Sequence, residues 1–149
     1  MKCIIQRVKS ASVNIDNKIV AQIEKGLLVY VGFVSGDTEK DVDLLLDRIE
    51  KIRIFEDEAG KLNLSMKDIG AEVLTVPNFT LYANAFTGRR PSFTTAMPFE
   101  EGKRLYDYLI SKPLFDAQHG VFGADMKIDS ICDGPINIII ESQGGKAKV

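Results

Sequence analysis

Two stretches of the chain carry apolar residues every three or four positions, which is the spacing of an amphipathic helix. In the first stretch, over 38–52, the apolar positions are Val42, Leu45, Leu46, Ile49 and Ile52, with charged residues largely on the opposite face. In the second, over 98–111, they are Leu105, Tyr106, Leu109 and Ile110, and Pro98 suits the first turn of a helix. Both helices are predicted to turn these apolar faces inward.

Segments that lack this spacing and end at turn residues predict strands. The run 27–33 is apolar on both faces and bounded by glycine, as in a strand in the middle of a sheet. The expected strands are 2–15, 18–23, 27–33, 53–55, 72–76, 79–82, 127–132 and a final strand that ends at Glu141. Blocks of strands alternate with the helices, which predicts an α/β domain with a mixed, barrel-like sheet and the two helices packed outside it.

The composition fits one globular domain. The chain has 149 residues, of which 45% are hydrophobic, and a net charge of −2. One domain is expected over 1–142, and the polar tail 143–149 is expected to be disordered. No apolar run is long enough to span a membrane, and charge appears too early at the N-terminus for a signal peptide. We therefore expect a soluble, cytoplasmic protein without membrane contact.

Common catalytic and metal-binding motifs are missing. The sequence has no phosphate-binding glycine loop, no GxGxxG, no HExxH and no GxSxG. Cys3 and Cys132 lie far apart without a CxxC spacing, so the thiols are expected to be reduced and to bind no metal. His119 is the only histidine, and a lone loop histidine is more typical of a solvent-exposed residue than of a catalytic one. We expect neither a metal nor another cofactor.

Pro77 and a long loop mark two places where chemistry is conceivable. Pro77 interrupts an extended run, which favours a bulge or a sheet edge, and Thr80 is either a nucleophile or an ordinary strand threonine. The loop 83–97 is longer than compact domains usually contain. Its Arg89 and Arg90 either grip phosphate or are simply solvated.

A glycine–proline dipeptide, Gly134-Pro135, stands just before the apolar run 138–140. Proline has no N–H for a ladder and fixes its own φ, so the dipeptide is either an ordinary trans turn or a cis peptide. Phe93, Phe122 and Met126 are each either core residues or part of a base-stacking surface. Taken singly, none of these features identifies an activity.

Six segments acquire meaning when they are taken in order. They are Gln6-Arg7-Val8 with Ala11-Ser12-Val13, Arg53-Ile54-Phe55-Glu56-Asp57, Phe79-Thr80-Leu81-Tyr82, Gly88-Arg89-Arg90-Pro91-Ser92-Phe93, Phe122-Gly123-Ala124-Asp125-Met126 and Asp133-Gly134-Pro135. In this order and at about this spacing, the sequence resembles the D-aminoacyl-tRNA deacylase family, also called D-tyrosyl-tRNA deacylase. The resemblance runs from Met1 to about Ser142.

The resemblance implies a barrel-like homodimer that hydrolyses the ester between a D-amino acid, or glycine, and the 3′-terminal adenosine of tRNA. It implies that the RNA's own 2′-hydroxyl helps to activate water, and that the Gly-Pro peptide is cis and reaches into the partner subunit's site. The implied residues are Pro77, Asn78, Phe79 and Thr80 for catalysis, Gly134 and Pro135 held by Arg7 for chirality, and Phe122, Gly123 and Met126 for adenosine. Arg89 and Arg90 stay candidates for contacts with RNA phosphate on the chemistry of their side chains alone.

Two motifs depart from the family pattern. The family usually has Ser-Gln-x-Thr-Leu where this chain has Pro77-Asn78-Phe79-Thr80-Leu81, and Asn-x-Gly-Pro-x-Thr where this chain has Cys132-Asp133-Gly134-Pro135-Ile136-Asn137. Two alternative functions therefore stay open at the level of sequence. One is a tRNA-binding paralogue without catalysis, and the other is a hydrolase that acts on a different acylated adenosine.

Overall fold

The computed structural model describes residues 1–113 and 118–148. The strands are β1 (Lys2–Ile15), β2 (Lys18–Ile23), β3 (Gly26–Gly32), β4 (Arg53–Glu56), β5 (Leu62–Ser65), β6 (Glu72–Pro77), β7 (Lys127–Gln143) and β8 (Lys146–Ala147). The helices are α1 (Glu39–Lys51), α2 (Met66–Ile69), α3 (Phe99–Ile110) and the 3-10 helix η1 (Phe79–Tyr82).

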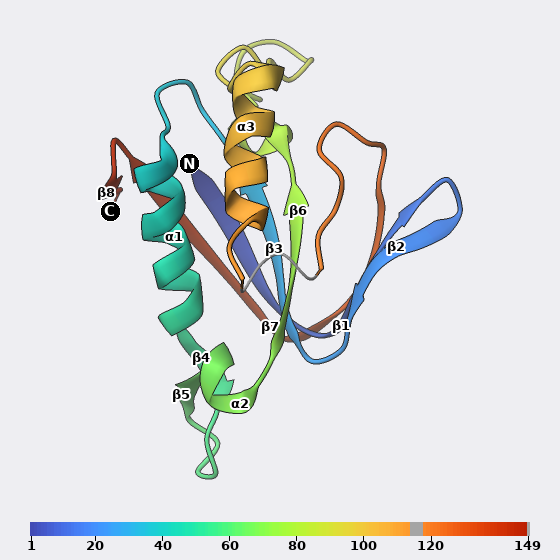
Figure 1. The fold of residues 1–149 in the computed structure, drawn as a ribbon, viewed down its shortest axis with the longest axis vertical. Coiled ribbons are helices and arrows are strands. Elements are labelled where there is room, and N and C mark those ends of the chain that lie inside the picture. The colour runs from blue at the N-terminus through green and yellow to red at the C-terminus, as the bar shows by residue number, and fades with distance from the viewer. Residues whose placement is uncertain (114–117, 149) are drawn as a thin grey trace.

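Strand β1 organises the main sheet. The strand order is β6-β3-β1-β7-β8, and β2 also pairs with β1. β1 runs antiparallel to β2, β3 and β7, whereas β3 is parallel to β6, so the sheet is mixed. The sheet curls into a half-barrel with α1 and α3 side by side across one face, and β4 and β5 form a separate hairpin below (Figure 1). The predicted α/β class with a mixed sheet and two outer helices is confirmed.

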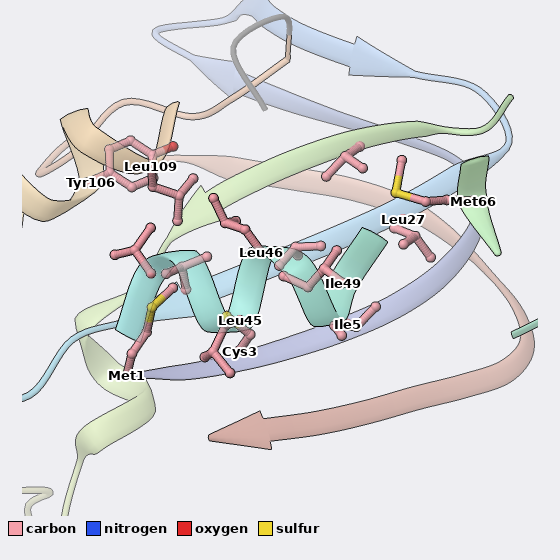
Figure 2. Packing of buried hydrophobic residues seen from close by; sticks show 14 of the residues in the cluster. Met1, Cys3, Ile5, Leu27, Leu45, Leu46, Ile49, Met66, Tyr106 and Leu109 are labelled. Carbon is pink, nitrogen blue, oxygen red and sulfur yellow. The ribbon is translucent and has the colours of Figure 1, made fainter. Parts of the chain in front are cut away.

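The larger core cluster fills the space between this sheet and the two helices. From α1 it takes Val42, Leu45, Leu46 and Ile49, and from α3 it takes Leu105, Tyr106 and Leu109. Figure 2 shows Leu45 beside Cys3 and Ile49 beside Ile5 of β1, while Leu46 extends toward Leu109 of α3. Each such side chain contributes about 1.5–3 kcal/mol when it leaves water. The two helical faces predicted from the sequence are confirmed, although Ile52 and Ile110 are only partly buried.

The two described ends of the chain meet beside α1. The ammonium group of Met1 is fully buried, lies 2.6 Å from Oδ1 of Asp37 and donates to the carbonyl of Ser142 at 2.8 Å. The tail does not match the predicted disorder over its described part, because β8 turns back and pairs with the end of β7. Gly144 and Gly145 both have positive φ, which a tight hairpin turn requires. Val149 lies outside the described residues.

Two strand predictions are wrong in detail. Residues 79–82, expected to be a strand, form the 3-10 helix η1, because the Asn78 side chain caps its first turn. The two strands expected at 127–132 and up to Glu141 are one continuous strand, β7, with Gly134-Pro135 inside it. Between α1 and β6 the apolar pattern predicted only the strand 53–55. The structure has the β4–β5 hairpin and the short helix α2 there.

Candidate active site

The segment that follows β6 presents one backbone N–H without a partner. Pro77 is buried and has no N–H, and the N–H of Asn78 donates to the carbonyl of Val31 at 2.7 Å, the last bond to β3. The N–H of Thr80 donates to Oδ1 of Asn78 at 3.1 Å. Within the part of the chain that the structure describes, the N–H of Phe79 has no acceptor. It is therefore the group in this segment that can donate to a ligand.

The hydroxyl of Thr80 is engaged in the same cap. Its Oγ1 donates to Oδ1 of Asn78 at 2.5 Å. An amide oxygen accepts this hydrogen bond but cannot take the proton away, so it does not activate the hydroxyl as a nucleophile. Of the two roles open to Thr80 from sequence, the geometry favours the structural one.

A pocket of about 560 Å³ opens beside this segment. It is lined by Pro77, Phe79, Phe93, Thr94, Ala96, Met97, Pro98, Phe99, Phe122 and Gly123. The rings of Phe79 and Phe93 meet edge to face at 5.2 Å, and those of Phe99 and Phe122 at 5.1 Å. The volume suits a small ligand, and aromatic walls suit a planar one.

None of the described residues that line this pocket carries an ionisable side chain. The pocket therefore offers no side chain for general acid–base chemistry, and any proton has to pass through the ligand or through water. The phenol of Tyr106, whose ring packs on Phe122, does not change this conclusion. Burial raises its pKa, so it stays protonated at neutral pH.

The structure brings most of the expected pocket residues together. Pro77, Phe79, Phe122 and Gly123 line the pocket, whereas Met126 is not among the described lining residues and packs against the second core cluster. Phe93, which the sequence left open as a core or a base-stacking residue, lines the pocket. Sequence reasoning missed Phe99 as a pocket residue, along with Thr94, Ala96, Met97 and Pro98. Their signal was the length of the loop 83–97, which ends at the start of α3.

A second pocket of similar volume, about 550 Å³, lies against α1. Its rim includes Asp43, Asp47 and Glu50, with Lys67 and Lys112. All five of these side chains form ion pairs: Lys112 with Asp43, Lys67 with Glu50, and Asp47 with Lys51. An acidic rim whose lysines are already paired disfavours a phosphorylated ligand, so the aromatic pocket is the better candidate site.

Gly134 and Pro135 form a main-chain bulge in β7. The ladder between β1 and β7 pairs Gln6 with Asn137 and Val8 with Cys132, so the residues 133–136 stand opposite Arg7 alone. The peptide bond between Gly134 and Pro135 is cis, as the resemblance implied. Gly134 has φ of 124°, and a Cβ there would lie 2.9 Å from Cγ1 of Ile136, so this position requires glycine. Both residues of the dipeptide are exposed.

Arg7 holds this bulge through contacts with Asp133. Its guanidinium donates to the carbonyl of Asp133 at 3.2 Å and to the buried carbonyl of Ile54 at 2.9 Å. The carboxylates of Asp133 and Glu56 lie 3.3 and 3.8 Å away. The sequence singled out Arg7 but not these partners, because the hairpin β4–β5 that supplies Ile54 and Glu56 reaches it only through tertiary packing.

The remaining predicted residues lie outside the aromatic pocket. Arg89 and Arg90 are exposed on the loop before α3, and His119 sits near the carbonyl of Gly120 without lining the pocket. Among the described residues, no cluster of three or more His, Cys, Asp and Glu side chains could hold a metal ion. None of the helices described is both long and apolar enough to cross a membrane.

The fold is that of a small α/β protein, and its candidate site combines a free main-chain N–H with aromatic walls. The chain belongs to the D-Tyr-tRNA(Tyr) deacylase family, whose model matches residues 4–141. It is 46% identical to the D-aminoacyl-tRNA deacylase of Geotalea uraniireducens (strain Rf4), over 99% of this chain and 97% of the relative. It is 45% identical to the enzyme of the same name from Clostridium tetani (strain Massachusetts / E88), over 96% of this chain and 98% of the relative.

Solved structures share the fold. The c-Myc DNA Unwinding Element Binding Protein superposes with a TM-score of 0.89 at 34% identity, covering 95% of this chain and 99% of its own. A structure described as a "probable eukaryotic D-amino acid tRNA deacylase" superposes with a TM-score of 0.79, covering 93% and 97%. At 16% identity, this second likeness concerns the fold alone.

Proposed function

We propose that the protein hydrolyses the ester bond of D-aminoacyl-tRNA and releases the free D-amino acid and tRNA, as a proofreading step in translation. The observation that carries this proposal is the family match over residues 4–141, together with relatives named D-aminoacyl-tRNA deacylase that align over nearly the whole chain. Glycine attached to tRNA is proposed as a second substrate, because it presents no Cβ to a site that selects by exclusion.

The backbone N–H of Phe79 is proposed to polarise the ester carbonyl and to hold the oxyanion that develops on it. A preorganised donor aimed at developing charge is the usual main-chain contribution to acyl transfer. The support is that Pro77, Asn78 and Thr80 offer no competing donor, for the reasons given above. Because the described pocket residues include no ionisable side chain, the 2′-hydroxyl of the substrate ribose is proposed to help activate water.

Gly134 and Pro135 are proposed to act in the site of a partner subunit as the chirality filter. Their carbonyl groups would accept from the substrate ammonium and leave no room for the Cβ of an L-amino acid. Support comes from the exposure of the bulge, from its bracing by Arg7, and from its absence among the described residues that line the pocket of its own chain.

Phe122 and Gly123 are proposed to enclose the terminal adenine, with Met126 packed behind them. Phe122 lines the pocket. Sδ of Met126 and the ring of Pro77 both lie beside Gly120. Stacking of one base on an aromatic ring is worth about 1–3 kcal/mol, which suits a ligand held without ion pairs.

A homodimer in the cytoplasm is proposed as the working form. β7 exposes Ile131 and Ile139, at 59% and 63% of their surface, which is typical of a surface that pairs with another copy. Sedimentation equilibrium is expected to give twice the mass of the chain, and substitution of both isoleucines by aspartate should give a monomer. A wild-type monomer would remove the basis for a filter that acts across subunits.

The direct test uses tRNA charged with D-tyrosine, L-tyrosine or glycine. We expect release of D-tyrosine and glycine, with L-tyrosyl-tRNA left intact, followed as loss of acid-precipitable label. Binding of charged tRNA without release of either amino acid would identify a paralogue without catalysis. Activity on D-tyrosyl-adenosine but not on charged tRNA would identify a hydrolase for another acylated adenosine.

A further inference from the structure

The loop between η1 and α3 carries three exposed side chains that the pocket does not use. Phe86 is fully exposed, at 101% of its reference surface, and Arg89 and Arg90 are exposed beside it. An aromatic ring left wholly in water forgoes the free energy that burial would supply. Such a ring next to two cations marks a surface that another molecule can cover.

This segment, the 84–92 loop, is built to present its tip. Asn84 and Ser92 exchange main-chain hydrogen bonds of 2.8 and 2.9 Å that close its base. The side chain of Asn84 accepts from the N–H of Phe86 at 3.0 Å, and Gly88, with φ of 77°, makes the turn. The loop therefore has a fixed base, and Phe86 stands away from the pocket's own aromatic wall.

The charge of the loop differs from that of the whole chain. The stretch 83–97 contains two arginines and no aspartate or glutamate, although the chain has a net charge of −2. Among the described residues, neither Arg89 nor Arg90 forms an ion pair. A guanidinium with a free fork matches phosphate in geometry and charge, so the loop suits an anionic partner.

The 84–92 loop is continuous with the candidate pocket. Phe93, the next residue, packs on Phe79 and lines the pocket wall. In Figure 1 the loop (olive) projects beyond the first turn of α3, where Phe99 lines the same pocket. A polymeric ligand whose terminal unit occupies the pocket can thus contact the loop with the units next to that terminal unit.

We propose that the 84–92 loop binds the single-stranded RNA adjoining the terminal adenosine, with Phe86 stacked on an unpaired base and Arg89 and Arg90 on the phosphates. This inference rests on the proposed function, because it takes charged tRNA as the ligand of the pocket. The proposal specifies single-stranded RNA, because a base can stack on a side chain only where one of its faces is free.

The first test compares Phe86→Leu with Phe86→Tyr. Loss of stacking in Phe86→Leu should raise KM for D-tyrosyl-tRNA by about 5- to 150-fold with kcat unchanged, whereas Phe86→Tyr keeps a ring and should stay near wild type. On D-tyrosyl-adenosine, which has no adjoining nucleotide, both variants should match wild type. Leu62→Ala, another exposed apolar side chain on the distant β4–β5 hairpin, is the matched control.

The second test measures binding of uncharged tRNA to the wild type, Arg89→Ala and Arg90→Ala as salt is varied. Each loop variant should bind more weakly and should lower the slope of log K against log salt by about 0.7, the value for one phosphate contact on a single strand. Lys61→Ala, an exposed cation on the distant hairpin, should keep the wild-type slope.

The outcomes separate this inference from the proposed function. A wild type that binds uncharged tRNA but releases no amino acid contradicts the proposed deacylase, and the binding of Phe86→Leu then still decides the role of the loop. Wild-type affinity in Phe86→Leu, an equal loss in Phe86→Tyr, or an equal loss on D-tyrosyl-adenosine would overturn the inference.

Discussion

Arg7 on β1 holds Asp133 on β7 by a hydrogen bond of 3.2 Å from its guanidinium to the main-chain carbonyl. The two residues are 126 positions apart in sequence, and Asp133 directly precedes the Gly134-Pro135 bulge. The same guanidinium donates to the carbonyl of Ile54, so one buried side chain joins the bulge to the β4–β5 hairpin. Its removal affects both the shape of the bulge and the stability of the protein.

Arg7→Ala should leave the carbonyl of Ile54 without its donor, which costs about 1–3 kcal/mol of the free energy of unfolding. Arg7→Lys keeps a charge but not the planar fork, so it should retain more stability while still losing at least tenfold in kcat/KM on D-tyrosyl-tRNA. Urea unfolding and single-turnover deacylation measure the two effects. Lys9→Ala, exposed on the same strand, should change neither, and an Arg7→Lys variant with full activity would contradict a positioning role.

Phe79→Pro should abolish deacylation while the protein stays folded. Phe79 is the first residue of η1, a position where helices accept proline, and Asn78 before it is extended, with φ of −146°. The substitution removes the N–H proposed to hold the oxyanion, and loss of one such donor lowers kcat by about 10²–10³. Circular dichroism checks the fold.

Two neighbouring variants separate the donor from the side chains. Phe79→Ala removes the ring but keeps the N–H, so it should weaken binding more than it lowers kcat. Thr80→Ala should keep substantial activity, because the hydroxyl serves the cap on Asn78. Loss of all activity in Thr80→Ala, together with activity in Phe79→Pro, would restore threonine as the nucleophile.

The sequence predicted the elements whose signal is local and missed those fixed by distant partners. The spacing of Val42, Leu45 and Ile49 is sufficient to define α1, because a helix buries residues that are close in sequence. The apolar letters of 79–82 suit a strand equally well, and only the cap from Asn78 makes them helical. Gly144-Gly145 was an available hairpin signal, since two glycines in succession favour a tight turn.

The site shows the same division between features with a local signal and features fixed by distant partners. Pro77, Phe79, Phe122 and Gly123 of the pocket were named from motifs. The free N–H of Phe79 depends on where every neighbouring N–H donates, and sequence does not show that. The contact of Ile54 and Glu56 with Arg7 is tertiary in the same way. Met126 belongs to a matched motif, yet it packs into the second core cluster instead of lining the pocket.

Stability should fall in acid partly through the cap of α2. Hydrogen bonds from the backbone and the hydroxyl of Ser65 lower the pKa of Asp68. A carboxylate with a lower pKa in the folded state binds fewer protons there than in the unfolded state, so its contribution is present above the ordinary pKa, near 4, and is lost as pH falls through the lowered value. Thermal melts should show Asp68→Ala less stable than wild type at pH 6, with the gap in Tm narrowing toward pH 2. Asp57 and Glu141 titrate in both the wild type and the variant, so they affect both melts alike. A gap in Tm that widens in acid would contradict the assignment of this stability to Asp68.

The thiol of Cys3 should be unreactive in the folded protein. Burial raises its pKa to about 12, so almost no thiolate exists at pH 8. In Cys132→Ser, where Cys3 is the remaining thiol, a disulfide reagent such as Ellman's should titrate none in buffer and one in guanidinium chloride. Rapid reaction in buffer would show that the first strand opens readily.

The pairing of β1 with β7 joins the beginning of the chain to its last long strand. Domains begin to fold from the N-terminal side during synthesis, but contacts between residues this far apart in sequence must wait for both partners. On the ribosome, therefore, the half-barrel lacks the strand that carries Gly134 and Pro135 until nearly all of the chain has emerged. The proposed chirality filter is therefore among the last parts of the fold that can form during synthesis.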